Sequence, residues 1–238
     1  IVSASLTDNR TYINRALPVK KSFDIIERNL IIGGQNSTFY FIDGFTKDET
    51  MLKLMDSVLN ISADDMPEDA TSFSASCIPY VEVDILGDFD SIFKNLLSGV
   101  TCLFIDGYEA AIAIDCRTYP SRSIEEPDKD KSLRGSRDGF VETIVFNTAL
   151  MRRRIRDPHL IMEMYEAGAS TRTDVALCYM SDRVDRELLT TIQNKLGEIK
   201  SQDLKMSQQS LAEALFQRKW YNPFPKYKFT ERPDTACA

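Results

Sequence analysis

Residues 100–115, VTCLFIDGYEAAIAID, contain two short apolar runs separated by the turn dipeptide Asp106-Gly107. Runs of this length, rich in β-branched residues and bounded by a turn signal, predict two strands. Just upstream, Asp88 is placed to cap a helix that continues to Leu97. Residues 78–85, IPYVEVDI, predict another strand before that helix. Strands that alternate with helices in this way indicate an α/β fold.

The N-terminal part extends the same pattern. Residues 1–21 show no regular spacing and are expected to be irregular. Residues 22–34, SFDIIERNLIIGG, and 37–44, STFYFIDG, predict extended segments that end at Gly-Gly and Asp-Gly turns. Apolar residues at helical spacing predict a helix over 47–59, and residues 62–72 predict a polar loop. FIDG occurs at 41–44 and again at 104–107, which internal duplication and chance convergence explain equally well.

The C-terminal part predicts a second α/β unit. Residues 117–137 are polar, contain two prolines and are expected to form a linker or long ordered loop. The expected elements that follow are helices over 140–155, 157–168, 182–200 and 207–218, a strand over 173–180 and an extended piece over 225–230. We expect an α/β fold of two subdomains, residues 22–116 and 138–238, each a small mixed β-sheet packed with helices.

Composition excludes several classes of protein. The net charge of −7 makes the chain as a whole a poor non-specific binder of nucleic acid. No apolar run approaches the roughly 18 residues that a membrane-spanning helix needs. The N-terminus has no signal pattern and does not begin with Met, so we read the chain as trimmed from a parent that need not be soluble. The five cysteines are odd in number and contain no C-x-x-C, which favours reduced, buried thiols.

Few residues suggest catalysis. His159 is the single histidine, which removes most histidine-based nucleophilic and metal chemistry, and it is expected to lie exposed in the first turn of a helix. Glycine-rich nucleotide loops are absent. The paired carboxylates Glu125-Glu126 and Asp64-Asp65 fall in polar segments where solvated charge is the ordinary explanation. We therefore expect no catalytic residue, no metal and no cofactor.

The segment 134–158, RGSRDGFVETIVFNTALMRRRIRDP, concentrates basic residues around an apolar helix. Arginines at a helix C-terminus complement the helix dipole, which is a plain structural reason for most of them. On a helical wheel Arg154 shares an otherwise apolar stripe with Asn147, so we expect Arg154 to pair with a carboxylate at a subdomain or subunit junction. Because the helix is apolar nearly all round, it is expected to be central and buried. An anion-cradling turn over 134–139 is the weaker alternative.

Several ordered motifs resemble a known family. IDCRTYPSRSIEEPD (114–128), the arginine segment, TRTDVALCYM (171–180) and WYNPFPKYKFTERPD (220–234) resemble the soluble N-terminal domain of GerA-type spore germinant receptor A subunits. YFIDGFTKDETM, YPSR and NPFP resemble the stage V sporulation protein AF branch of that family. The resemblance covers roughly residue 22 to the C-terminus. It departs at Asp130-Lys131-Ser132, where the family pattern has an acidic residue followed by a hydrophobic pair.

The resemblance implies a place and partners for the chain. The parent would be a polytopic protein of the inner spore membrane, with this domain on the cytoplasmic (spore core) side. Its partners would be other germination membrane proteins and copies of itself, in complexes that release ions. Arg122 and Arg232 would pair with acids of the opposite subdomain. The motif positions carried over as interaction or coupling residues are Arg122, Glu126, Arg134, Gly135, Arg137, Asp138, Gly139, Asn147, Arg152, Arg153, Arg154, Arg156, Glu231 and Arg232.

Two functional hypotheses of different classes follow. The first is a non-catalytic domain that acts in assembly and signal coupling of a germinant receptor or ion-release complex. The second is a small-molecule binding domain that holds a germinant or an anion between the two subdomains, at the turn over 134–139.

Overall fold

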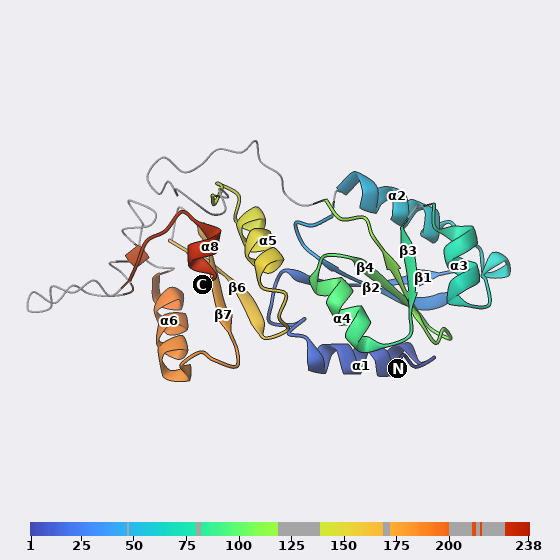
Figure 1. Cartoon of the computed structure of the whole chain (residues 1–238), viewed down its shortest axis with the longest axis horizontal. Coiled ribbons are helices and arrows are strands. Elements are labelled where there is room, and N and C mark those ends of the chain that lie inside the picture. The colour runs from blue at the N-terminus through green and yellow to red at the C-terminus, as the bar shows by residue number, and fades with distance from the viewer. Residues whose placement is uncertain are drawn as a thin grey trace, which may run out of the picture.

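The protein was analysed as a computed structural model that describes residues 1–46, 48–79, 82–118, 139–168, 172–199, 211, 212, 215 and 227–238. Two groups of elements lie side by side in Figure 1. We call residues 1–118 the first lobe and residues 139–238 the second lobe. The predicted subdomain boundaries remain predictions, because most of the expected linker over 117–137 lies outside the described residues.

The first lobe is built on a five-stranded sheet of order β1-β2-β4-β5-β3. Its strands are β1 (Ile25–Ile32), β2 (Gln35–Ile42), β3 (Val83–Leu86), β4 (Thr101–Ile105) and β5 (Ala111–Ile114). All four neighbouring pairs are antiparallel. The predicted α/β class with two helix-packed sheets is confirmed, but the sheets are antiparallel rather than mixed. Helix α4 (Phe89–Leu97) does join two parallel strands, β3 and β4, yet β5 is inserted between them.

Helices cover both faces of this sheet (Figure 1). Helix α1 (Leu6–Ala16) and α4 pack on one face, where Ile13, Ile92 and Phe104 are buried in one apolar cluster. Helices α2 (Asp48–Leu59) and α3 (Ala70–Cys77), joined through the 3₁₀ turn η1 (Ala63–Asp65), cover the other face. The lobe is therefore a three-layer arrangement with its core on both sides of the sheet.

Two first-lobe predictions were wrong for related reasons. Residues 1–21 were expected to be irregular, but they contain α1, whose N-cap Ser5 accepts a hydrogen bond from Asp8 N at 3.3 Å. The polar loop over 62–72 contains η1 and the start of α3, capped by Asp69. Both helices have few apolar positions, so their helical state depends on packing against the sheet rather than on a clear periodic pattern.

The second lobe contains an antiparallel pair of strands, β6 (Leu160–Ala167) and β7 (Thr173–Met180). Helices α5 (Ile144–Arg154), α6 (Arg186–Ile199) and the short α8 (Pro233–Ala236) surround the pair in Figure 1. The helix predicted over 157–168 was wrong, since this segment is β6. Asp157 and Pro158 form a tight turn in which Leu160 N donates to Asp157 O at 3.2 Å, and Gly168, with φ +93°, ends a strand.

Other boundaries agree with expectation or differ slightly. The side chain of Asp88 caps α4 by accepting from Ser91 N at 2.8 Å, as predicted. Helix α5 begins at Ile144 instead of residue 140, and α6 begins at Arg186. The predicted helix over 207–218 lies mostly outside the described residues, and the described part of the predicted extended piece, residues 227–230, forms no regular strand. Within the described part of the chain, no helix has the length and apolar character required to cross a membrane.

Candidate functional site: the junction between the lobes

The first lobe reaches the second through the short segment Ser22–Asp24, which connects α1 to β1. Phe23 N donates to Met162 O at 3.0 Å, and Met162 N donates to Ser22 Oγ at 2.9 Å. The segment thus satisfies both backbone groups of Met162 on β6. Residues about 140 positions apart in the sequence are joined here by one main-chain and one side-chain hydrogen bond, so the two lobes share a backbone contact as well as side-chain contacts.

Arg152, on the last turn of α5, makes the central polar contact of the junction. Its Nε donates to Asp24 Oδ2 at 2.7 Å and its Nη2 lies 3.2 Å from Asp24 Oδ1. The remaining donors reach Asp157 O and Leu160 O, each at 3.0 Å. Ser22 Oγ completes the network by donating to Asp24 Oδ1 at 2.5 Å. The guanidinium is therefore hydrogen-bonded on three sides by two different lobes.

Burial makes this ion pair unusual. The side chains of Arg152 and Asp24 are 0% and 1% exposed. An isolated charge at such a position would be strongly unfavourable, and only pairing plus further hydrogen bonds offsets the loss of hydration. Every contact described above serves that purpose, so the network is a satisfied one. Because each partner needs the other, the pair holds α5 and the start of β1 in one relative position.

An apolar contact lies beside the ion pair. Ala149 of α5 packs with Ile25, Ile42 and Phe45 of the first lobe in one buried cluster. The approach is close because Gly44 has no side chain: a Cβ at this position would lie 3.1 Å from the Ala149 Cβ. Gly44 also has φ +79°, a conformation that glycine adopts readily. The first FIDG turn, residues 41–44, is therefore the part of the first lobe against which α5 packs.

The second FIDG turn differs in its surroundings. Gly107 also has positive φ, at +91°, but a Cβ there would meet nothing within 4 Å. Both FIDG turns thus use glycine for the turn, and of the two only the first uses it for close packing.

Beside the first FIDG turn, burial raises the pKa of Asp43. The nearby Asp24 and Asp48 carboxylates also raise this pKa, and a hydrogen bond from Gly44 N–H lowers it.

The structure places Arg152, and not Arg154, at the buried position that faces a carboxylate of the other lobe. Arg154 was expected to be the buried, paired guanidinium, but it is exposed, and Arg152 takes that position. The helix was also expected to be buried all round, whereas Phe146 is 44% exposed and the buried residues are Thr148, Ala149 and Arg152. The wheel failed because it compared residues within the isolated helix, whereas the side of α5 that carries Ala149 packs against the Gly44 turn of the first lobe.

Asn147 has a local role. Its Oδ1 accepts from Val141 N at 2.7 Å and its Nδ2 donates to Val141 O at 2.6 Å. The side chain therefore fixes the chain that enters α5. Nearby, Phe140 N donates to Glu231 O at 2.8 Å, which ties the same entry segment to the chain before α8.

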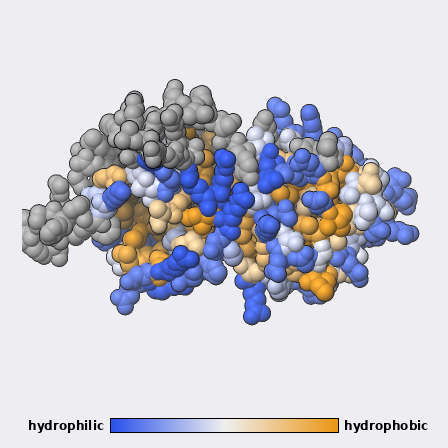
Figure 2. All heavy atoms as spheres, viewed as in Figure 1, coloured by the Kyte–Doolittle hydropathy of each residue, from blue (hydrophilic) through white to orange (hydrophobic). Residues whose placement is uncertain are grey.

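The remaining motif residues are distributed as follows. Arg232 forms an ion pair with Asp234, two residues along the chain, at 2.6 Å, whereas a partner in the opposite subdomain was expected. Arg153 and Arg156 are exposed at the end of α5. Figure 2 shows hydrophilic residues over the region that α5 occupies in Figure 1. Gly139 is the first described residue of the second lobe, and the motif positions outside the described residues are Arg122, Glu126, Arg134, Gly135, Arg137 and Asp138.

Ser22 and Asp24 were missed from the sequence. They stand in SFDIIERN, where a serine and an aspartate before an apolar run are typical of any loop that precedes a strand. Only a weak signal could have identified them as site residues: an arginine on a helix face with small apolar neighbours needs a carboxylate somewhere else in the chain. Sequence alone offered 36 acidic residues as candidates.

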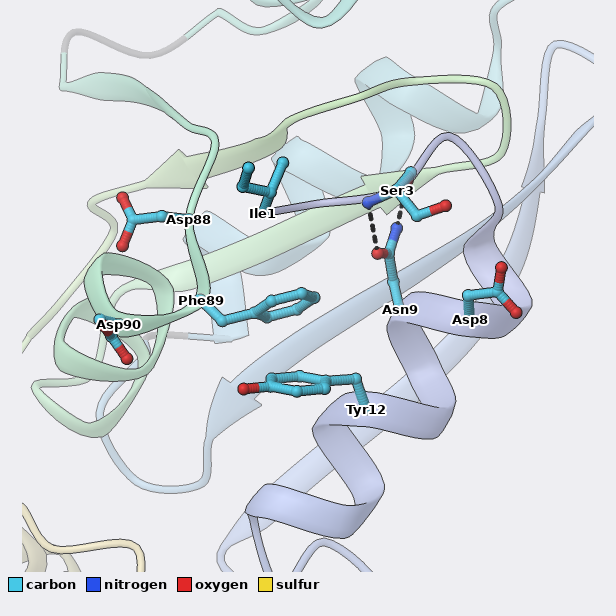
Figure 3. Close-up of a pocket in the computed structure, with 8 residues that line it drawn as sticks. All are labelled: Ile1, Ser3, Asp8, Asn9, Tyr12, Asp88, Phe89 and Asp90. Atoms are coloured by element: carbon cyan, nitrogen blue, oxygen red, sulfur yellow. Dashed lines mark hydrogen bonds between the residues drawn. The ribbon is translucent and has the colours of Figure 1, made fainter.

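Among the hollows in the described part of the chain, two are lined by first-lobe residues. One, of about 340 Å³, lies between α1 and the start of α4 and includes Asp8, Tyr12, Asp88 and Phe89 (Figure 3). Two of its polar side chains already serve the fold: Asp88 caps α4, and Asn9 bonds the backbone of Ser3 in both directions. The other, of about 260 Å³, lies beside β1 and β2 and includes Arg10, Asn29 and Asp106.

The cysteines, the histidine and the potential metal ligands in the described part of the chain do not form a reactive site. No cluster of three or more potential metal ligands is found there. The five cysteines are free thiols, as predicted, although three of them are half-buried rather than buried. Burial raises the pKa of the Cys102 thiol to about 12. His159 is exposed, as predicted, and its Nδ1 lies 2.8 Å from Asp157 Oδ1.

Comparison with known proteins identifies the class. Residues 12–238 match the family model described as Bacillus/Clostridium GerA spore germination protein. This two-lobed α/β chain therefore belongs to the GerA spore germination family, which confirms the resemblance noted in its motifs. Most of the curated relatives that it matches are spore germination proteins, and the germinant receptor subunits of the family are not known as enzymes.

Individual relatives agree with that assignment. Stage V sporulation protein AF of Bacillus subtilis (strain 168) is 33% identical over 230 residues, which cover 96% of this chain and 46% of that protein. Spore germination protein KA of the same organism is 28% identical over 241 residues, covering 100% of this chain and 44% of that protein. The chain thus spans less than half the length of these relatives.

A solved structure supports the fold. The crystal structure of the N-terminal domain of the A subunit of the Bacillus megaterium spore germinant receptor GerK3 matches with a TM-score of 0.67. The match covers 99% of this chain and 87% of that chain at 22% identity. At this identity the likeness concerns the fold alone.

Proposed function

We propose that this chain is a non-catalytic domain of a spore germination membrane protein, acting in assembly and signal coupling within an inner-membrane germinant receptor or ion-release complex. The observation that carries the proposal is the fully buried Arg152–Asp24 ion pair, which joins the two lobes. Protein groups satisfy this pair, so a bound substrate is not needed to explain it. A domain that transmits a force or a change of orientation needs lobes that move as one body, and a buried, satisfied ion pair supports such behaviour.

The surface that would meet partners is the exposed end of α5. Arg152 faces inward, while Arg153, Arg154 and Arg156 are exposed around the same helix end. Their positive charges lie directly outside the junction, so a partner that binds them would act next to the contact between the lobes. We propose these arginines, together with the motif positions that precede α5 and those near Glu231, as the coupling residues. The partners would be other germination membrane proteins and further copies of this chain.

The test must separate contact from folding. Replacing Arg152 would disturb the junction itself, so the test variant is Arg153→Gln/Arg156→Gln in the full-length protein, with Arg152 intact. We expect normal protein levels in spores, weaker co-purification with other germination proteins and slower germination. Matched controls are Arg15→Gln and Arg183→Gln, which remove exposed arginines elsewhere. If the double variant assembled and germinated as the controls do, the coupling role of this surface would be wrong.

The second hypothesis places a small germinant or anion between the lobes at the 134–139 turn. Five of those six residues lie outside the described part of the chain, and the inter-lobe contact described around Arg152 is formed by protein groups on both sides. No described feature favours the ligand over the coupling role, so the coupling role is the function proposed.

A further inference from the structure

Strand β1 forms an open edge of the five-stranded sheet. It lies at one end of the strand order and pairs with β2 over all eight of its residues, Ile25–Ile32. Among the described residues, no strand pairs with its other side. An edge of this length is usually shortened, bulged or covered, because its free backbone groups are a template for another strand.

The hairpin geometry determines which backbone groups point outward. The two-residue loop Gly33-Gly34 has φ values of +53° and +80°, which are typical of a type I′ turn. Such a turn is closed by a pair of residues that exchange backbone hydrogen bonds, here Ile32 and Gln35. At the other end Asp43 N donates to Asp24 O at 2.8 Å. Since bonded pairs alternate along an antiparallel ladder, the even-numbered residues of β1 bond β2 and the odd-numbered ones face away from it.

Three odd-numbered residues remain available on the open side. Ile25 N is already used, because it donates to Ser22 O at 3.3 Å. The N–H and C=O groups of Glu27, Asn29 and Ile31 have no such use in the described part of the chain. Ile31 is 64% exposed, a large value for an apolar strand residue.

The side chain of Asn29 supplies an independent observation. Its Oδ1 accepts from Thr38 Oγ1 at 2.8 Å, which fixes the orientation of the amide. The Nδ2 group has no partner among the described residues, and the residue is exposed. A positioned amide donor beside an open strand edge is well placed to bond a group on an added strand.

We infer that the open edge of β1 is a docking surface for β1 of a second copy of this chain, paired antiparallel about a two-fold axis at Asn29. A two-fold axis through the pairing places residues of equal parity opposite each other. Centring on Asn29 uses all three available residues: Asn29 faces its own copy, and Glu27 faces Ile31 in both directions. The two five-stranded sheets then become continuous.

Charge and the length of the pairing select this register over its neighbours. Centring on Glu27 would place two carboxylates directly opposite each other, and centring on Arg28 would do the same with two guanidinium groups; like charges in that position are unfavourable. Centring on Leu30 or Ile31 would pair less of the strand, because the Gly33-Gly34 turn follows. At the Asn29 register the other face sets Arg28 against Leu30 and Ile26 against Ile32, with no like charges opposed. The amide of each Asn29 meets the other amide.

The inference deepens the proposed role in assembly by naming a surface and an occupant. It rests on backbone geometry in the first lobe and not on the arginines of α5. A single strand pair is smaller than a standard protein interface, so we expect a weak dimer, strengthened where a membrane concentrates the parent protein. Its test uses the 238-residue chain in solution, so its failure and that of the coupling role are distinguishable.

Two readouts test the interface. Sedimentation should show a concentration-dependent monomer–dimer equilibrium. Amide hydrogen exchange should show alternation: Ile26, Arg28 and Leu30 protected at every concentration, but Glu27, Asn29 and Ile31 protected only as the dimer forms. A chain that stays monomeric up to about 1 mM, where binding energies near 4 kcal/mol become visible, would overturn the inference. So would a dimer in which the odd-numbered amides gain no protection.

Substitutions at the two-fold position sharpen the test. Asn29→Asp sets two carboxylates opposite each other and should weaken the dimer at least tenfold, whereas Asn36→Asp, the same exposed amide-to-acid change on β2, should not. Asn29→Pro removes the outward N–H together with the side-chain bond to Thr38, and should also abolish dimerisation. The β1–β2 amides of each variant, followed by hydrogen exchange, report whether the sheet is intact. Equal dimerisation by Asn29→Asp and Asn36→Asp would place the contact elsewhere and overturn the inference.

Discussion

At the scale of single residues, Arg152 is the position on which the junction depends most. Arg152→Met leaves the Asp24 carboxylate buried without its cation, and breaking a buried pair in this way costs about 3–5 kcal/mol. We expect a loss of that size in the unfolding free energy, measured by urea denaturation. Asp24→Asn/Arg152→Met removes both charges and should recover part of the loss. Equal stability of wild type and Arg152→Met would contradict the role assigned to the pair.

Glu163 is a second residue with a testable electrostatic role. It lies on β6 and accepts hydrogen bonds from Tyr165 Oη at 2.6 Å, Tyr179 Oη at 2.7 Å and Gln193 Nε2 at 2.8 Å. Burial alone would raise the pKa of Glu163, but these hydrogen bonds outweigh it and lower the pKa below its ordinary value of 4.5. The carboxylate thus binds three different elements of the second lobe into one polar group.

The sign of its pH dependence follows from that lowered pKa. A carboxyl whose pKa is lower in the folded state stabilises the fold above the unfolded value and loses that contribution as pH falls through the folded value. We expect the stability difference between wild type and Glu163→Gln to be largest near pH 7 and to shrink below about pH 4.5. Glu166→Gln, an exposed change on the same strand, is the control. A difference that stayed constant between pH 7 and pH 3 would contradict this account.

At the scale of elements, the two FIDG turns provide a matched comparison. Gly44→Ala and Gly107→Ala both force alanine into positive φ, at a cost of about 1–2 kcal/mol each. Gly44→Ala alone also crowds α5, since its Cβ would lie 3.1 Å from the Ala149 Cβ and 3.3 Å from Val145 O. Overpacking of this kind adds about 1–3 kcal/mol.

We therefore expect Gly44→Ala to lower the unfolding free energy by at least about 1 kcal/mol more than Gly107→Ala, as measured by urea denaturation of both variants. Gly44→Ala/Ala149→Gly, which removes the opposing methyl group, should recover part of the difference. If the two single variants were equally destabilised, α5 would not rest on the Gly44 turn as described.

Elements also show how far sequence reasoning reached. The α4 helix, its Asp88 cap and the strands β4, β5 and β7 were predictable because cap, turn and periodicity all act within a few residues. The segment 157–168 was not, because Asp, Pro and Gly punctuate turns around strands as well as helices. Pairing with Thr173–Met180, a contact between distant positions, decides for the strand.

The junction illustrates the same limit. A buried arginine with a carboxylate partner across the lobes was predictable in kind, because a charge surrounded by apolar residues requires one. Its identity was not, since the wheel of an isolated helix favours Arg154, while the position of the Gly44 turn makes Arg152 the inward residue. The Asn29 edge likewise required the strand order, which no local pattern encodes.

At the scale of the whole molecule, the lobes differ in what holds them together. Apolar clusters cover both faces of the five-stranded sheet. Among its described residues the second lobe has a two-stranded sheet, and Ala149 is the one that belongs to the third cluster, which is otherwise formed by the first lobe. A two-stranded sheet is marginal without support from neighbours. We infer that the second lobe depends on the junction more than the first lobe does.

Hydrogen exchange of the Arg152→Met variant measures that dependence. With the Arg152–Asp24 pair broken, we expect amide protons of β6 and β7 to exchange at least tenfold faster, because about 1.4 kcal/mol of local stability corresponds to that factor. Amides of β4 and of the middle of β2, such as Phe39 and Tyr40, should keep their protection, since these residues lie in the two clusters that do not include the junction. Wild type should instead lose protection in both lobes together as denaturant is added. Equal acceleration of β2 and β6 in the variant would show that the junction stabilises the molecule as one unit, because a break at one contact would then propagate through both lobes.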